Sequence, residues 1–188
     1  MHQDGVDWKA KDGIVDTEIF ASQEVKILWI LREPNGEGFD FMSYLKNPTN
    51  YNRWKASYGL VVKISYAMIN KISDWKSIPD PSKIVHETMS KIAIMNIKKT
   101  GGKATINSKK ILAYSLENKN TITSQIIDIS PDIIIFGGTK NYILPDEINT
   151  IKAKIDKPVK TISAYHPNQR KITHKEYINK VLSEFYRK

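Results

Sequence analysis

Three side chains that could act together in a hydrolytic reaction stand at the ends of apolar runs in the sequence. Glu33 and His166 each come shortly after such a run, and Asn96 lies near the end of another. A carboxylate can orient or deprotonate a water, and a histidine can donate a hydrogen bond to a developing anion. An asparagine carries a donor and an acceptor that can read an amide-like edge. This set suits hydrolytic displacement of a group that leaves as an anion.

The hydrophobic pattern predicts the elements that position these side chains. Four short apolar runs, at 27–31, 92–97, 133–136 and 159–164, are typical of buried strands. Helices are expected at 51–72, 82–90, 108–115 and 121–129, with a looser helical connection at 140–156. The spacing of Thr173 and Glu176 predicts the capping box of a final helix. A short helix around Ile19 and Phe20 and a helical turn at 39–45 complete the prediction.

Strands that alternate with helices predict one α/β domain over 1–188, with three layers. Its centre is expected to be a four-stranded parallel sheet with helices on both faces, because parallel strands need crossover connections. The carboxyl ends of parallel strands share one edge of the sheet, and ligands of open α/β sheets bind there. Glu33, Asn96, Gly137, Gly138 and His166 are therefore expected to converge, although more than 130 residues separate the first from the last.

Composition excludes several kinds of chemistry. The 188 residues include no cysteine, so disulfides, thiolate metal sites and cysteine nucleophiles are ruled out. No metal site or other cofactor is expected, since Glu33 and His166 lack ligand partners at recognisable spacing. No apolar run reaches the roughly 20 residues of a membrane span, and the first residues lack the apolar core of a signal peptide, which predicts a cytoplasmic protein without membrane contact. The net charge of +9 favours a polyanionic partner such as nucleic acid.

Three segments resemble motifs of the uracil-DNA glycosylase superfamily. Leu31-Arg32-Glu33-Pro34-Asn35-Gly36 stands in the place of its first motif, which reads like Gly-Gln-Asp-Pro-Tyr or Gly-Ile-Asn-Pro-Gly. Met95-Asn96-Ile97-Lys98 is similar to the strand-end asparagine segment that contacts the flipped base. Tyr165-His166-Pro167-Asn168 is similar to the His-Pro-Ser motif. In element order the resemblance covers about residues 25–175.

The resemblance implies a role for each matching residue. Glu33 would position the water, His166 would stabilise the departing uracil through its O2 oxygen, and Asn96 would pair with the base edge. Phe41 would stack on the flipped ring, although packing in the core is the alternative for this side chain. The remaining residues implied in binding are Pro34 and Asn35 for the substrate, and Lys98, Lys99, Pro167, Asn168 and Arg170 for DNA.

The leading hypothesis is a monomeric, monofunctional DNA glycosylase that releases uracil or another deaminated or damaged base during base-excision repair. Two alternatives stay open at this point. One is a non-catalytic nucleic-acid-binding module with the same fold. The other is a hydrolase of free nucleosides or nucleotides, whose activity would depend little on salt, whereas DNA binding weakens steeply with salt.

Overall fold

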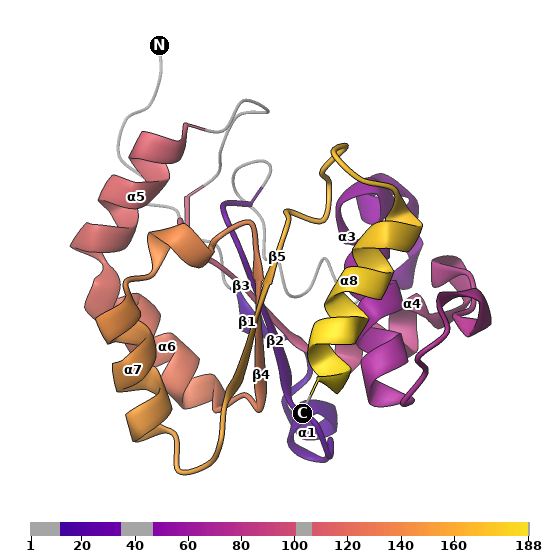
Figure 1. Cartoon of the computed structure of the whole chain (residues 1–188), viewed down its shortest axis with the longest axis horizontal. Coiled ribbons are helices and arrows are strands. Elements are labelled where there is room, and N and C mark those ends of the chain that lie inside the picture. The colour runs from indigo at the N-terminus through magenta and orange to yellow at the C-terminus, as the bar shows by residue number, and fades with distance from the viewer. Residues whose placement is uncertain (1–11, 35–46, 101–106, 188) are drawn as a thin grey trace.

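The protein is described by a computed structural model that covers residues 12–34, 47–100 and 107–187 (Figure 1). Within these residues the chain forms an α/β fold with seven α-helices and one sheet. Asn35, Phe41 and the helical turn expected at 39–45 lie outside the described residues.

The sheet has five strands in the order β1-β3-β2-β4-β5. Four of them are parallel to one another and confirm the four predicted strands: β2 (Ile27–Leu31), β3 (Ala93–Asn96), β4 (Ile133–Gly137) and β5 (Lys160–Ala164). The prediction of an all-parallel, four-stranded sheet is wrong in one respect. A two-residue strand, β1 (Gly13–Ile14), pairs antiparallel with β3 and makes the sheet mixed. Two residues are too few to show a period, so only tertiary pairing with the open edge of β3 defines this strand.

Helices cover both faces of the sheet, as Figure 1 shows. One face carries α3 (Tyr51–Ile69), α4 (Pro81–Ser90) and α8 (His174–Tyr186), and the other carries α5 (Ser108–Glu117), α6 (Lys119–Ile129) and α7 (Pro145–Lys154). A short helix, α1 (Thr17–Ala21), precedes β2 and confirms the helix expected around Phe20. Three 3-10 turns, η1 (Pro48–Asn50), η2 (Trp75–Ser77) and η3 (Lys140–Tyr142), lie in the connections.

The central strand β2 shows why the strands read as continuous apolar runs. All five of its residues are buried, because each face of the sheet meets a helical layer. Trp29 and Leu31 pack into the core beneath α3, α4 and α8, whereas Leu28 and Ile30 pack into the core on the opposite face. The indole Nε1 of Trp29 donates to Ser65 Oγ at 2.9 Å, so this polar atom is satisfied inside the core.

Two helix ends follow from local chemistry. The capping box of α8 is confirmed: Thr173 Oγ1 accepts from the backbone nitrogen of Glu176 at 3.2 Å, and Glu176 Oε2 accepts from the backbone nitrogen of Thr173 at 2.8 Å. Helix α3 ends at Ile69, three residues before the predicted end. Lys71 has a φ of 56°, which a right-handed helix cannot contain.

Candidate functional site at the carboxyl edge of the sheet

The ends of β2, β3, β4 and β5 meet at one edge of the sheet, as the sequence predicted. The backbone nitrogens of Ile97 and Lys98 donate to the carbonyls of Leu31 and Arg32, each at 2.9 Å, and so extend the β2–β3 pairing past both strands. The backbone nitrogen of Gly138 donates to the carbonyl of Ala164 at 2.8 Å and ties the end of β4 to the end of β5. Polar residues distant in sequence are thereby brought to one edge.

Glu33 forms an ion pair at this edge. Its Oε2 lies 3.0 Å from Lys98 Nζ, and the side chains of Glu33 and Lys98 are 10% and 19% exposed. Lys98 Nζ also donates to the carbonyl of Thr100 at 3.1 Å. These contacts orient a largely buried carboxylate, and they give the predicted DNA-binding residue Lys98 a position beside the predicted catalytic residue.

Asn96 carries an amide that is buried. The residue is 1% exposed, and among the residues that the structure describes neither its Oδ1 nor its Nδ2 has a hydrogen-bond partner. Its backbone nitrogen, in contrast, donates to Asp12 Oδ2 at 2.6 Å. An unsatisfied buried polar group costs about 1–3 kcal/mol, so native proteins keep few of them. A side chain of this kind at the carboxyl edge is suited to receive the donor and acceptor of a ligand.

His166 is held as a neutral imidazole. Burial first, and the charge of Arg32 second, lower its pKa from the ordinary 6.5 to about 4. Nδ1 accepts from the backbone nitrogen of Asn168 at 3.2 Å, so the proton of the neutral ring is on Nε2. The loop is also fixed to α8, because the Tyr177 hydroxyl donates to the Tyr165 carbonyl. At neutral pH the ring can therefore donate one hydrogen bond through Nε2.

Gly137 and Gly138 allow the loop after β5 to approach β4. Gly138 has a φ of 72°, and a Cβ atom on it would lie 3.0 Å from the backbone nitrogen of His166. A Cβ atom on Gly137 would lie 2.7 Å from Leu31 Cδ2 and 3.2 Å from Pro167 Cδ. Glycine at these two positions is what places His166 against the end of β4.

The other predicted binding residues differ in their accessibility. Asn168 and Arg170 are exposed, as contact with DNA would require, whereas Pro34 and Pro167 are buried. Pro167 is buried where its Cδ lies close to Gly137, so its role in the loop after β5 includes packing against the end of β4. The buried Pro34 can shape the loop after β2 but offers no open surface to a substrate.

Lys99 was predicted to contact DNA, but the structure places its ammonium among interior side chains. The residue is 9% exposed, and its Nζ lies 2.8 Å from Asp12 Oδ1 and 2.6 Å from Gln125 Oε1. Gln125 Nε2 in turn donates to Asp12 Oδ1 at 2.9 Å. We call these three residues the Asp12–Lys99–Gln125 network. Because its ammonium is engaged on both sides in the interior, Lys99 is a structural residue.

Sequence reasoning missed this network and also Arg32. Asp12 lies 87 residues before Lys99, and no spacing rule relates the two residues to each other or to Gln125. Arg32 Nε donates to the Gly138 carbonyl at 3.1 Å, which places its guanidinium next to the His166 loop. In the sequence, only the position of Arg32 directly before Glu33 could have indicated that it belongs to the site.

Among the residues that the structure describes, no group of three or more His, Asp or Glu side chains is placed to hold a metal ion. None of the helices that these residues form is both long enough and apolar enough to cross a membrane. The chain matches no protein-family model, no curated protein and no solved structure. The function therefore has to be argued from the site itself.

The neutral state of His166 predicts a specific pH dependence. Between about pH 4 and pH 6.5 the unfolded chain binds a proton at this side chain that the folded chain does not bind, so the free energy of unfolding rises with pH across this window. The contribution is about 3 kcal/mol when fully present. Titration of the imidazole by NMR should give a pKa of about 4. Urea unfolding should show a steeper rise in the wild type than in His166→Gln, which keeps only the rise due to carboxylates such as Glu176; equal slopes in the two proteins would contradict the assignment.

Proposed function

We propose that this protein is a monofunctional DNA glycosylase that hydrolyses the N-glycosidic bond of uracil or another deaminated base in DNA. The observation that carries the proposal is the unpartnered, buried amide of Asn96 at the same sheet edge as the Glu33 carboxylate and the neutral His166. An amide can pair with a base edge, a carboxylate can orient a water, and a neutral imidazole can donate to an anionic leaving group.

The reaction assigns one task to each side chain. The bond between C1′ of the sugar and the base nitrogen breaks, and its electron pair stays on the base. The oxygen of a water positioned by Glu33 bonds to C1′, and the proton of that water passes to the carboxylate. His166 Nε2 donates to the oxygen on which the negative charge of the base develops. The released base then takes a proton from solvent.

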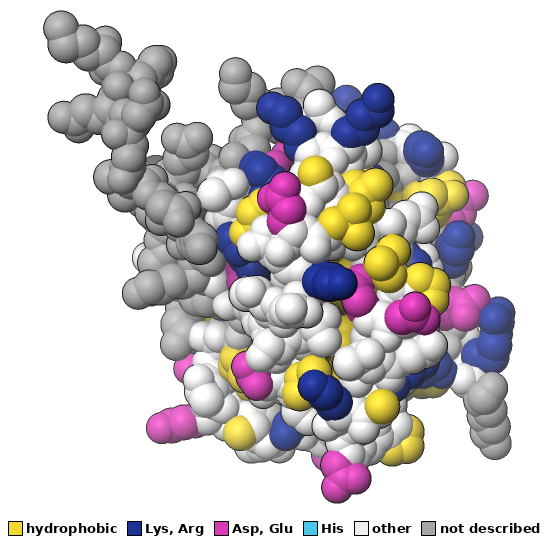
Figure 2. All heavy atoms as spheres, turned by 90° about the vertical axis from the view of Figure 1, so that its left-hand side faces the viewer, with side chains coloured by type: hydrophobic (Ala, Val, Ile, Leu, Met, Phe, Trp, Pro, Cys, Tyr) yellow, Lys and Arg dark blue, Asp and Glu magenta, His cyan; other side chains and the backbone are white. Residues whose placement is uncertain are grey.

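The positive net charge of the chain supports DNA as the partner. The positions of the charged side chains support the loop after β5 as the surface that contacts DNA. Asn168 and Arg170 are exposed and come shortly after His166 in this loop. Nearby, the Nζ atoms of Lys171 and Lys180 lie 5.9 and 4.9 Å from the ring centre of Tyr165. Figure 2 shows the opposite helical layer, where Lys and Arg are interspersed with Asp and Glu over the face that α5, α6 and α7 form. Phosphate contacts are therefore assigned to the loop after β5.

The substitution Asn96→Leu tests whether the amide of Asn96 serves base recognition or only the structure. The substitution removes two unsatisfied polar atoms and keeps the number and branching of the side-chain heavy atoms, so the free energy of unfolding should rise by about 1 kcal/mol. Base release should nevertheless fall by about 100-fold, because the base edge loses its partner. The two quantities are measured by urea unfolding and by single-turnover cleavage of end-labelled oligonucleotides, each with one uracil, hypoxanthine or xanthine, followed by alkali.

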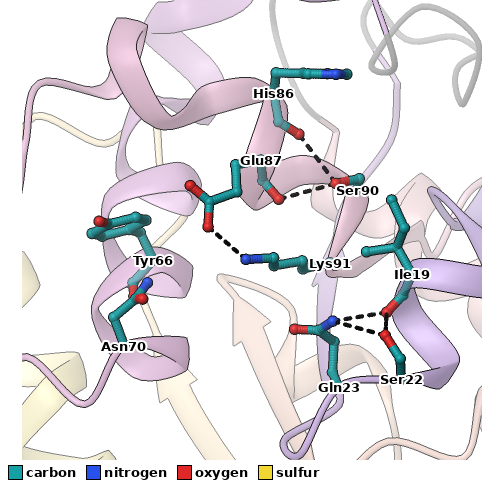
Figure 3. A network of polar contacts seen from close by, with 9 residues as sticks. All are labelled: Ile19, Ser22, Gln23, Tyr66, Asn70, His86, Glu87, Ser90 and Lys91. Atoms are coloured by element: carbon teal, nitrogen blue, oxygen red, sulfur yellow. Dashed lines mark hydrogen bonds and ion pairs between the residues drawn. The ribbon is translucent and has the colours of Figure 1, made fainter.

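A matched control lies at the amino edge of the sheet, in the contacts of Figure 3. Asn70 is exposed at the end of α3, where its Nδ2 donates to the Tyr66 carbonyl at 2.9 Å, and Asn70→Leu should leave cleavage unchanged. Unchanged cleavage by Asn96→Leu would contradict base recognition by this amide. If no oligonucleotide is cleaved while salt-sensitive DNA binding persists, the protein is a binding module. Cleavage of free nucleosides alone would indicate the small-molecule hydrolase.

A further inference from the structure

Arg32 and His166 both lie close to Gly138. Arg32 Nε donates to the Gly138 carbonyl at 3.1 Å. A Cβ atom on Gly138 would lie 3.4 Å from Arg32 Nη2 and 3.2 Å from His166 Cβ. The end of β4 thus fixes the guanidinium beside the imidazole, and the hydrogen bond through Nε leaves both terminal nitrogens of Arg32 able to donate elsewhere.

Among the described residues, no carboxylate balances the charge of Arg32. Among the described residues no Asp or Glu forms an ion pair with Arg32, and the adjacent carboxylate, Glu33, is bound to Lys98 at 3.0 Å. Arg32 is half-buried. A partly desolvated guanidinium usually has an anionic partner, because its charge costs free energy when water is removed. Its surroundings are therefore suited to an anion that arrives with the ligand.

Because His166 is neutral, a second, charged donor would add to the stabilisation of an anion at this site. Burial, with the charge of Arg32 as the second cause, holds the pKa of His166 at about 4, so at neutral pH the imidazole offers an uncharged hydrogen bond. Hydrogen bonds from a charged donor to an anion are roughly twice as strong as those between neutral groups. A fixed cation beside the imidazole would stabilise a developing negative charge without itself having to give up a proton.

We infer that Arg32 is a further catalytic residue, whose guanidinium binds the departing base as the electron pair of the broken C1′–N bond makes that base an anion. This inference rests on the proposed function and adds a residue to the same site. His166 and Arg32, which both lie next to Gly138, donate to the same anion. The proton that finally neutralises the base comes from solvent, so neither side chain changes its protonation state.

The test compares leaving groups of different acidity. Fluorine at C5 of uracil withdraws electrons and stabilises the base anion, so 5-fluorouracil needs less help from the protein. Single-turnover rates are measured for otherwise identical oligonucleotides with uracil or 5-fluorouracil, using the wild type, Arg32→Gln and Arg32→Lys. Arg187→Gln is the matched control, since this arginine is exposed directly after the end of α8 and its Nη2 pairs with Glu184 Oε1 at 3.1 Å.

Arg32→Gln should slow release of uracil by about 100-fold and release of 5-fluorouracil by about tenfold or less. Arg32→Lys should restore part of the loss on uracil, because it keeps the charge but not the planar fork. Arg187→Gln should match the wild type on both bases. Equal losses on the two bases would overturn the inference and make Arg32 a positioning residue of the loop. If the wild type releases neither base, the proposed function itself fails, and the inference fails with it.

Discussion

Glu33→Gln is expected to lower the rate of base release by about 10³-fold, which is the loss that removal of a general base typically causes. Glutamine keeps the length of the side chain and can still accept a hydrogen bond from Lys98 Nζ, which lies 3.0 Å from Oε2 in the wild type. It cannot take a proton from water. Single-turnover cleavage of a uracil oligonucleotide measures the effect. A gel-shift assay should show DNA binding within about twofold of the wild type, because the net charge of the protein changes by only one unit.

A second ion pair provides the control for this substitution. On α4, Lys91 Nζ pairs with Glu87 Oε1 at 2.5 Å in the contacts of Figure 3, and this pair lies just before β3, at the sheet edge opposite to Glu33. Glu87→Gln removes the same charge from an exposed pair and should leave the cleavage rate unchanged. Wild-type activity in Glu33→Gln would rule out this carboxylate as the base, and a parallel loss of activity and stability would point to misfolding instead.

The sheet could be predicted because its strands are buried on both faces. Residues 27–31 and 133–136 each form an uninterrupted apolar run, which helices on both sides of a parallel sheet require. The strand β1 could not be predicted in the same way. Gly13 and Ile14 carry no pattern of their own, and they become a strand only because the edge of β3 offers them unpaired backbone groups.

That Glu33, Asn96 and His166 converge at one edge could be predicted from the sheet topology. The residues that these side chains contact could not be predicted. Parallel strands bring Glu33, Asn96 and His166 to one edge whatever the connections between them contain. Whether a lysine near that edge faces solvent or the interior depends on long-range packing. Lys98 and Lys99 are neighbours in sequence, yet one pairs with Glu33 at the edge and the other is buried with Asp12. Adjacent residues point in opposite directions at a strand end, and composition does not reveal which direction meets a carboxylate.

The Asp12–Lys99–Gln125 network gives the largest expected effect on stability. Asp12→Asn should lower the free energy of unfolding by about 3–5 kcal/mol at pH 7, because it leaves the Lys99 ammonium buried without a counter-charge. The side chains of Lys99 and Asp12 are only 11% and 2% exposed, so solvent cannot replace the lost partner. Burial already lowers the pKa of Lys99, and Asp12 opposes this effect. Urea unfolding of the wild type and of Asp12→Asn measures the difference.

Two further measurements distinguish a buried charge from a simple loss of contacts. In Asp12→Asn the folded chain should release the Lys99 proton more readily than the unfolded chain, so stability should recover as the pH rises from 7 towards 10. The double variant Asp12→Asn/Lys99→Met should be more stable than the single variant, because it removes the unpaired charge. Glu87→Gln, which breaks an exposed pair, should cost less than about 1 kcal/mol. A double variant no more stable than Asp12→Asn would show that the charge is not the cause.

Since Asp12 Oδ2 also accepts from the backbone nitrogen of Asn96 at 2.6 Å, the network that stabilises this edge of the sheet is also what fixes Asn96 in the site.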